Sequence, residues 1–257
     1  MIKIKNPQSL ILAVPVLCFL LLEFYFFYPK SFYFALVLIL VLIGFTIFAM
    51  AKNSKNAIDG WYNFLILPIL FAASATSYTV FLPSKFLIHF IFVIISLFLY
   101  FYFKNIYFYL ISPRFYRKNA LENISSYGNF LVILFTFSTF LGLQLFLGVK
   151  VWILALASGL IVCLVTYQVL LANDLYFKKN LIYIFLNSLI LIELFWAASF
   201  LPLSYKSVGL ILAICYYMLI GISRFYLKGK TEEKKIKLYL LFGTISILAV
   251  ILSSKWL

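Results

Sequence analysis

Two acidic residues lie inside long apolar runs, where ionisable side chains are rare and usually functional. Glu193 is near the middle of the run Leu181–Leu203, and Glu23 is closer to one end of the run Leu10–Tyr28. A charge at the centre of a bilayer costs at least ~2.5–3.5 kcal/mol on insertion scales. Glu193 is therefore our first candidate for a proton carrier, a cation ligand or a substrate contact. The alternative is a protonated acid that is hydrogen-bonded to a neighbouring helix, because burial favours the neutral form.

Several hydroxyl, amide and imidazole side chains inside the apolar runs are further candidates for a functional role. The further candidates are Ser74, Ser77, Tyr78, His89 and Gln144. One interpretation is that these side chains and the two glutamates line a cavity that opens to the outer side. The alternative is ordinary helix packing, in which small Ser and Thr residues let helices approach and bond across.

Motifs of known chemistry are missing, and the sequence predicts neither a cofactor nor a metal. A single histidine excludes H-E-x-x-H zinc proteases and haem held by two histidines. The chain also lacks the G-x-x-x-x-G-K-[ST] phosphate loop. Its three cysteines, Cys18, Cys163 and Cys215, have no C-x-x-C spacing and are predicted to be buried apolar residues. Catalytic residues therefore stay unknown.

The composition places the chain in a membrane. It is 66% hydrophobic and 11% charged, whereas soluble domains are about 45–50% apolar and about 25% charged. The net charge of +14 is better explained by the anionic inner leaflet of a bilayer than by nucleic acid. We predict the lipid bilayer as a partner and no nucleic-acid partner.

Nine runs have about the 20 apolar residues that a transmembrane helix needs. They are Leu10–Tyr28, Phe32–Met50, Trp61–Leu82, Phe86–Phe103, Tyr127–Leu147, Val149–Leu171, Leu181–Leu203, Val208–Tyr226 and Ile236–Leu252. The fold class is therefore all-α, a polytopic bundle of about nine transmembrane helices. Eight is the alternative, because Ile236–Leu252 is short and has Lys237 in its first turn. Pro15 and Pro68 lie inside runs, and each frees one backbone carbonyl.

The basic residues predict the orientation. Sixteen of the 21 Lys and Arg residues fall in the N-terminal segment and alternate loops, and five fall on the other side. Because cytoplasmic loops carry the excess of basic residues, the N-terminus is predicted to be cytoplasmic. With nine spans, the C-terminus is outside the cell membrane.

Short turns and basic loops alternate along the chain, which suggests two-helix hairpins within a single transmembrane domain, 1–257. Phe71-Ala72-Ala73-Ser74 precedes Phe81-Leu82-Pro83, and Trp196-Ala197-Ala198-Ser199 precedes Phe200-Leu201-Pro202. One interpretation is an internal repeat of 1–126 and 127–235, followed by an extra helix at 236–252; the alternative is a chance resemblance between apolar helices.

Three functions are compatible with these features. The first is a transporter or carrier of a small molecule, an ion or a lipid that uses Glu193, with a polar path to it. The second is a noncatalytic membrane subunit or scaffold that binds other membrane proteins through an outer surface. The third is a membrane-embedded enzyme that modifies lipids, with Glu193 close to another acid, His89 or a metal. The lack of catalytic motifs favours a nonenzymatic role.

Overall fold

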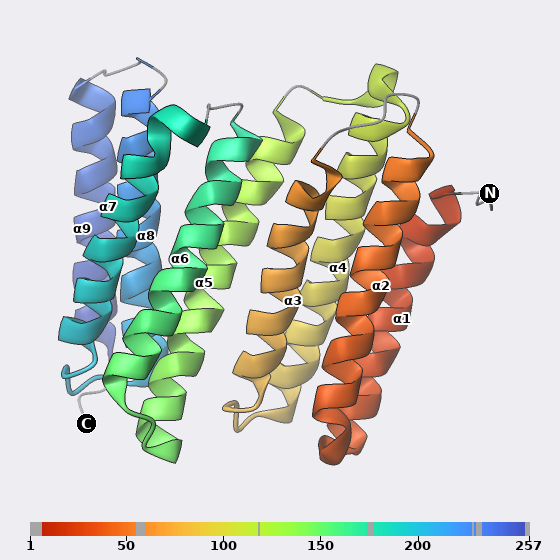
Figure 1. Cartoon of the computed structure of the whole chain (residues 1–257). Coiled ribbons are helices and arrows are strands. Elements are labelled where there is room, and N and C mark those ends of the chain that lie inside the picture. The colour runs from red at the N-terminus through yellow and green to blue at the C-terminus, as the bar shows by residue number, and fades with distance from the viewer. Residues whose placement is uncertain are drawn as a thin grey trace. The chain divides into compact units, whose positions relative to one another are not determined.

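The computed structural model describes residues 7–54, 60–117, 119–173, 177–227, 229 and 233–254, without the side chains of 7, 177–180 and 235. These residues form helices and turns and contain no β-strand (Figure 1). The chain divides into two compact units, 1–128 and 129–257. The boundary lies within one helix, and each unit is described by itself.

Unit 1 is a four-helix bundle. Its helices are α1 (Pro7–Phe27), α2 (Phe32–Lys52), α3 (Ile66–Thr79) and α4 (Lys85–Leu110). Short 3₁₀ helices precede α2 (η1, Pro29–Ser31), precede α3 (η2, Trp61–Leu65) and follow α4 (η3, Pro113–Phe115). Helix α1 packs against α2 and α4, and α3 also packs against α2 and α4. The four helices therefore form a closed ring.

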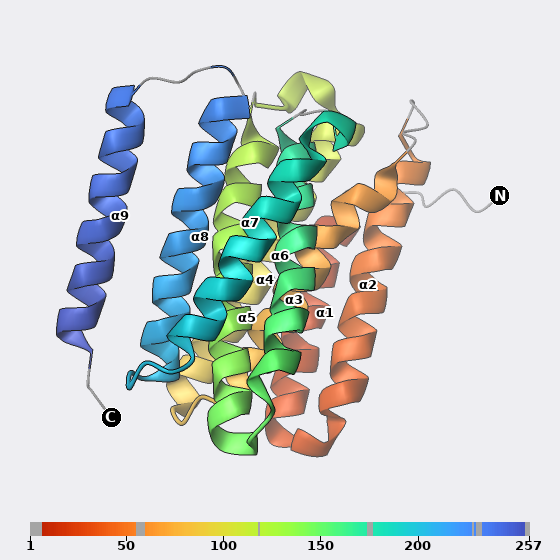
Figure 2. The ribbon, with the colours of Figure 1, turned by 60° about the vertical axis from the view of Figure 1, so that its left-hand side comes forward.

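Unit 2 contains most of α5 and four further helices. Their bounds are α5 (Ala120–Leu147), α6 (Val151–Ala172), α7 (Phe177–Ala198), α8 (Tyr205–Leu227) and α9 (Glu233–Ser253). Helix α7 packs between α6 and α8, and α9 lies alongside α8 at the edge of the unit (Figure 2). Only 6% of the apolar window of α9 is buried, against 56% for α6. Helix α9 therefore has most of its apolar surface available to lipid.

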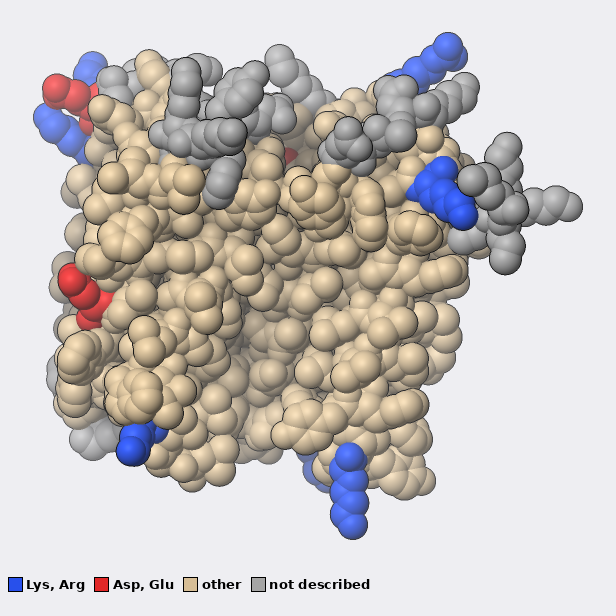
Figure 3. Space-filling view, viewed as in Figure 1, with Lys and Arg blue, Asp and Glu red and all other residues tan. Residues whose placement is uncertain are grey.

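Within the described residues, eight helices are long and apolar enough to cross a membrane. The all-α helical bundle is thereby confirmed. The last predicted run is among these eight, because α9 is a regular helix of 21 residues. The segment that falls short is α3, with 14 residues. Figure 3 shows Lys and Arg side chains at the two ends of the helices and an almost uncharged surface between them, as a multi-pass membrane protein requires.

Pro68 explains why α3 is short. A proline has no N–H and crowds the carbonyl four residues earlier, so it belongs in the first turn of a helix. Residues Trp61–Leu65 accordingly form the 3₁₀ helix η2, and α3 begins at Ile66. The carbonyl freed by Pro68 is that of Phe64, and the buried Tyr102 hydroxyl donates a hydrogen bond to it at 3.0 Å. The predicted free carbonyl is thus confirmed, and α4 satisfies it.

Tyr102→Phe is expected to lower the free energy of unfolding by about 1–2 kcal/mol, because the Phe64 carbonyl then stays buried without a donor. In a Pro68→Ala background the new amide of residue 68 can bond that carbonyl within the helix, so Tyr102→Phe should cost less there. Thermal unfolding of the four proteins in one lipid mixture measures the difference. Equal losses in both backgrounds would contradict this account.

The turn between α3 and α4 and the turn between α7 and α8 share a local structure. The amides of Phe81 and Leu82 bond the carbonyls three residues earlier, and so do those of Phe200 and Leu201. Each pair is followed by a proline, Pro83 or Pro202, which cannot continue a helix. The existence of two units does not require that they be related, and the repeat stays a prediction.

Candidate functional site

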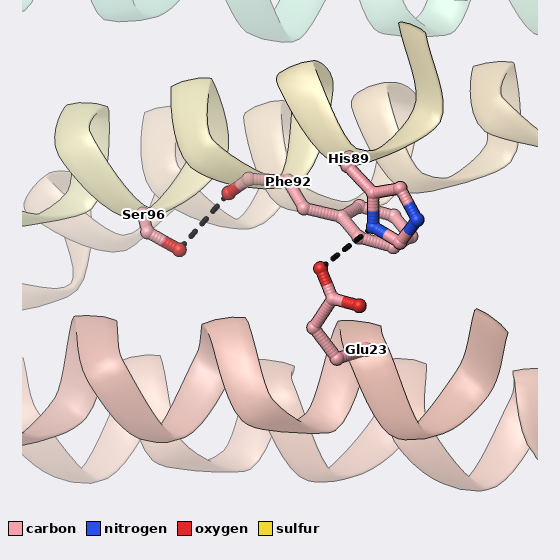
Figure 4. Close-up of polar contacts among 4 residues, drawn as sticks. All are labelled: Glu23, His89, Phe92 and Ser96. Carbon is pink, nitrogen blue, oxygen red and sulfur yellow. Dashed lines mark hydrogen bonds and ion pairs between the residues drawn. The ribbon is translucent and has the colours of Figure 1, made fainter. Parts of the chain in front are cut away.

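A carboxylate and an imidazole meet between α1 and α4 of unit 1. The Nδ1 atom of His89 lies 2.8 Å from Oε1 of Glu23 (Figure 4). The His89 side chain is 38% exposed and that of Glu23 is 21% exposed, so both atoms are within reach of the surroundings. Glu23 and His89, 66 residues apart in the sequence, are thus one pair.

Glu23 and His89 lie at the same distance from the ends of their helices. Glu23 is four residues before the end of α1, and His89 is four residues after the start of α4. At 1.5 Å per residue, each lies about 6 Å inside its helix end. The rings of Phe26 and Phe92 pack against the imidazole, with centroid distances of 4.4 Å and 6.1 Å. These contacts fix the plane of the ring.

The pairing determines which nitrogen of His89 is available. Nδ1 is hydrogen-bonded to the Glu23 carboxyl group, so Nε2 remains for another partner. In Figure 4 the second ring nitrogen points away from Glu23 and away from Phe92 and Ser96, toward the start of α4. Side chains on a helix lean toward its N-terminus, which explains this direction. The pair can therefore hold a proton or bind a polar group at that end of α4.

Glu193 lies elsewhere, on the exposed surface of α7 in unit 2. No hydrogen bond or ion pair joins it to any other residue that the structure describes. Helix α7 ends at Ala198 rather than Leu203, so Glu193 is five residues from that end of the helix, and its expected position at mid-span stays a prediction. Pro202 is the reason for the early end of the helix, because the chain winds into 3₁₀-type bonds ahead of it.

Among the seven candidate residues, the structure brings Glu23 and His89 together. Ser74 is buried and its hydroxyl donates to the Phe71 carbonyl at 3.2 Å within α3. Ser77 and Tyr78 are partly exposed on the same helix. Gln144 in α5 donates to the Ser199 carbonyl at 3.4 Å. These contacts are typical of helix packing, and functional roles for the four residues stay predictions.

Two pockets are formed by described residues, and none of the seven candidate residues lines either of them. One is a groove of about 240 Å³ between α8 and α9, where Tyr217, Met218, Tyr239 and Phe242 supply much of the lining. The other is a shallow hollow on α1. The described residues also include no group of three or more His, Cys, Asp or Glu that could hold a metal ion.

A buried amide pair in unit 2 was missed by the sequence interpretation. Asn129 of α5 donates to Oε1 of Gln168 in α6 at 2.6 Å, and both side chains are at most 5% exposed. Nearby, the Ser188 hydroxyl in α7 lies 3.0 Å from the Cys163 sulfur in α6. The sequence did contain a signal for this pair, because amide side chains inside apolar runs form hydrogen bonds to neighbouring helices.

Comparison with known proteins assigns the chain to a family without adding a function. A family model described as a protein of unknown function, DUF5656, matches residues 13–253. No curated protein matches the chain, and no solved structure matches it. Because the match covers nearly the whole length, this multi-pass membrane protein belongs to the DUF5656 family of proteins of unknown function.

Proposed function

We propose that this protein is a noncatalytic membrane subunit that binds another membrane protein laterally through α7. The observation that carries the proposal is the position of Glu193, exposed on a membrane helix with no described residue bonded to it. An acidic side chain facing lipid is unfavourable by several kcal/mol, and intramembrane acids nearly always have a partner. A helix of another membrane protein can supply that partner.

The surroundings of Glu193 support a protein contact below headgroup level. Trp196 and Phe200 are exposed at 56% and 70%, and both are closer to the helix end than Glu193. Aromatic side chains of this kind gather at the membrane–water interface. On the other side of Glu193, farther from the helix end, Leu189 and Leu186 are also exposed. These neighbours support a position of Glu193 within the apolar part of α7.

The other two candidate functions draw less support from this geometry. A carrier that couples transport through Glu193 needs a polar path to it, and both pockets described above lie elsewhere. A lipid-modifying enzyme needs a second reactive group beside Glu193, and no described residue bonds to it. The histidine that such an enzyme would recruit is paired with Glu23 instead.

We place the protein in the cell membrane with its N-terminus in the cytoplasm. In unit 1, Lys30 and Lys85 are at one end of the helices, and Lys52 and Lys104 are at the other. A cysteine at position 85 should react with a membrane-impermeant maleimide on intact cells. A cysteine at position 52 should react only after permeabilisation, and the reverse pattern would invert the orientation.

Photo-crosslinking tests the lateral contact. A benzophenone side chain at position 189 or 196 sits one turn to either side of Glu193 on the same face. Both positions should give a discrete protein adduct in native membranes, and its mass separates a second copy of the chain from another protein. Position 248 on α9, where Leu248 is 58% exposed, is the matched lipid-facing control and should give none.

The adducts at positions 189 and 196 should disappear when Glu193 is replaced by leucine. Crosslinks of equal yield at 248, or only lipid adducts at all three positions, would refute the proposed contact.

A further inference from the structure

We propose that His89 and Lys85 form a binding site for the phosphate group of an anionic phospholipid, with Glu23 as the positioning residue. This site belongs to unit 1 and does not depend on the role of Glu193. Its partner is a lipid, whereas the proposed function concerns a protein.

The first support is the free nitrogen of His89. With Nδ1 bonded to the Glu23 carboxyl group at 2.8 Å, Nε2 is the ring nitrogen left for another partner. That nitrogen points toward the start of α4 (Figure 4). A negatively charged phosphate oxygen beside Nε2 would favour the imidazolium form of the ring, which donates a charge-assisted hydrogen bond to it.

The second support is the place of Lys85. It is the first residue of α4, it is exposed, and it precedes His89 by four positions. Residues four apart on a helix are neighbours on one face, with their Cβ atoms about 5–6 Å apart. The ammonium group of Lys85 and Nε2 of His89 can therefore approach one phosphate group from the same face.

The third support distinguishes a lipid from a free anion. Phe86 and Phe90, on the same helix as Lys85 and His89, have rings inclined by 10° with centroids 6.4 Å apart, and they are 76% and 53% exposed. Phe27 at the end of α1 is 70% exposed. A phospholipid can place its phosphate on Lys85 and His89 and an acyl chain along these rings.

Glu23 has a specific part in this arrangement. Its carboxylate and the ring of Phe26 hold the imidazole so that Nε2 faces the end of the helix. A free imidazole would rotate about its side-chain bonds and lose part of its binding free energy on ordering. Glu23 therefore acts through His89 and does not touch the phosphate.

The experiment uses the full-length protein in nanodiscs of phosphatidylcholine, with and without phosphatidylglycerol. Native mass spectrometry measures the retained phosphatidylglycerol. Lys85→Gln and His89→Gln should each weaken its binding about tenfold, the usual size for one charge-assisted bond. His89→Arg supplies a cationic donor and should retain most of the binding.

Lys206→Gln is the matched control, because Lys206 is the second residue of α8 and is equally close to a helix end. It should leave phosphatidylglycerol binding unchanged. An equal loss in Lys206→Gln and His89→Gln would mean general attraction to an anionic surface and would overturn the proposal. Inorganic phosphate added to the phosphatidylcholine discs should not bind, and binding with the same sensitivity to Lys85 and His89 would replace the lipid with a free anion.

Discussion

Glu193→Leu is expected to release the protein from its lateral complex, with affinity reduced tenfold or more. The replacement removes the only acid in the sequence of α7. It leaves an apolar surface that lipid can cover as favourably as a partner protein can. A tenfold loss corresponds to about 1.4 kcal/mol, within the range expected for a polar contact between membrane helices. Glu193→Gln keeps a hydrogen-bonding group and should lose less. Blue native electrophoresis of mild-detergent extracts measures the fraction in the complex.

Glu233→Leu is the control for this prediction. Glu233 is an exposed acid in the first turn of α9, 3.7 Å from Lys237. Surface ion pairs of this kind contribute about 0–1 kcal/mol, so the complex should persist. A complex that survives Glu193→Leu intact would contradict the docking role of α7.

Gly209→Ala is expected to destabilise unit 2 by about 1–3 kcal/mol or more, the usual cost of overpacking a core. Helices α5 and α8 approach so closely at this position that an added Cβ would collide with the Ser138 hydroxyl. It would also lie 2.9 Å from the Ser138 backbone nitrogen and 3.0 Å from its Cα. Backbone atoms cannot move without shifting a whole helix, and the added methyl group therefore forces the helices apart.

Gly159→Ala provides the comparison within the same unit. The atoms that an added Cβ would meet there are the end of the Ile192 side chain, which can rotate away. Thermal unfolding should therefore show a clearly smaller loss for Gly159→Ala than for Gly209→Ala. Ser138→Ala should not rescue Gly209→Ala, since the backbone contacts remain. An equal loss of stability in the two glycine variants would show that the close approach of backbone atoms does not determine the destabilisation.

The sequence alone determined the membrane location, the helical class and most of the spans. These follow from run length and apolar content, which depend only on local composition. It also placed the freed carbonyl, because the effect of Pro68 on Phe64 acts within one turn. The shortened end of α7 is also a local effect of Pro202, and greater weight on that proline would have predicted it.

Only the tertiary structure decided which polar residues meet. Glu23 and His89 are joined across 66 residues, whereas Glu193 faces outward on α7. In a soluble protein, an apolar stripe marks the side of a helix that faces the core. A membrane helix is apolar on all sides because lipid accepts each of them, so hydropathy does not reveal how it is rotated. The direction in which each polar side chain points is then set by contacts between helices that are far apart in the sequence. Examples are Phe26 against His89 and Ser138 against Gly209.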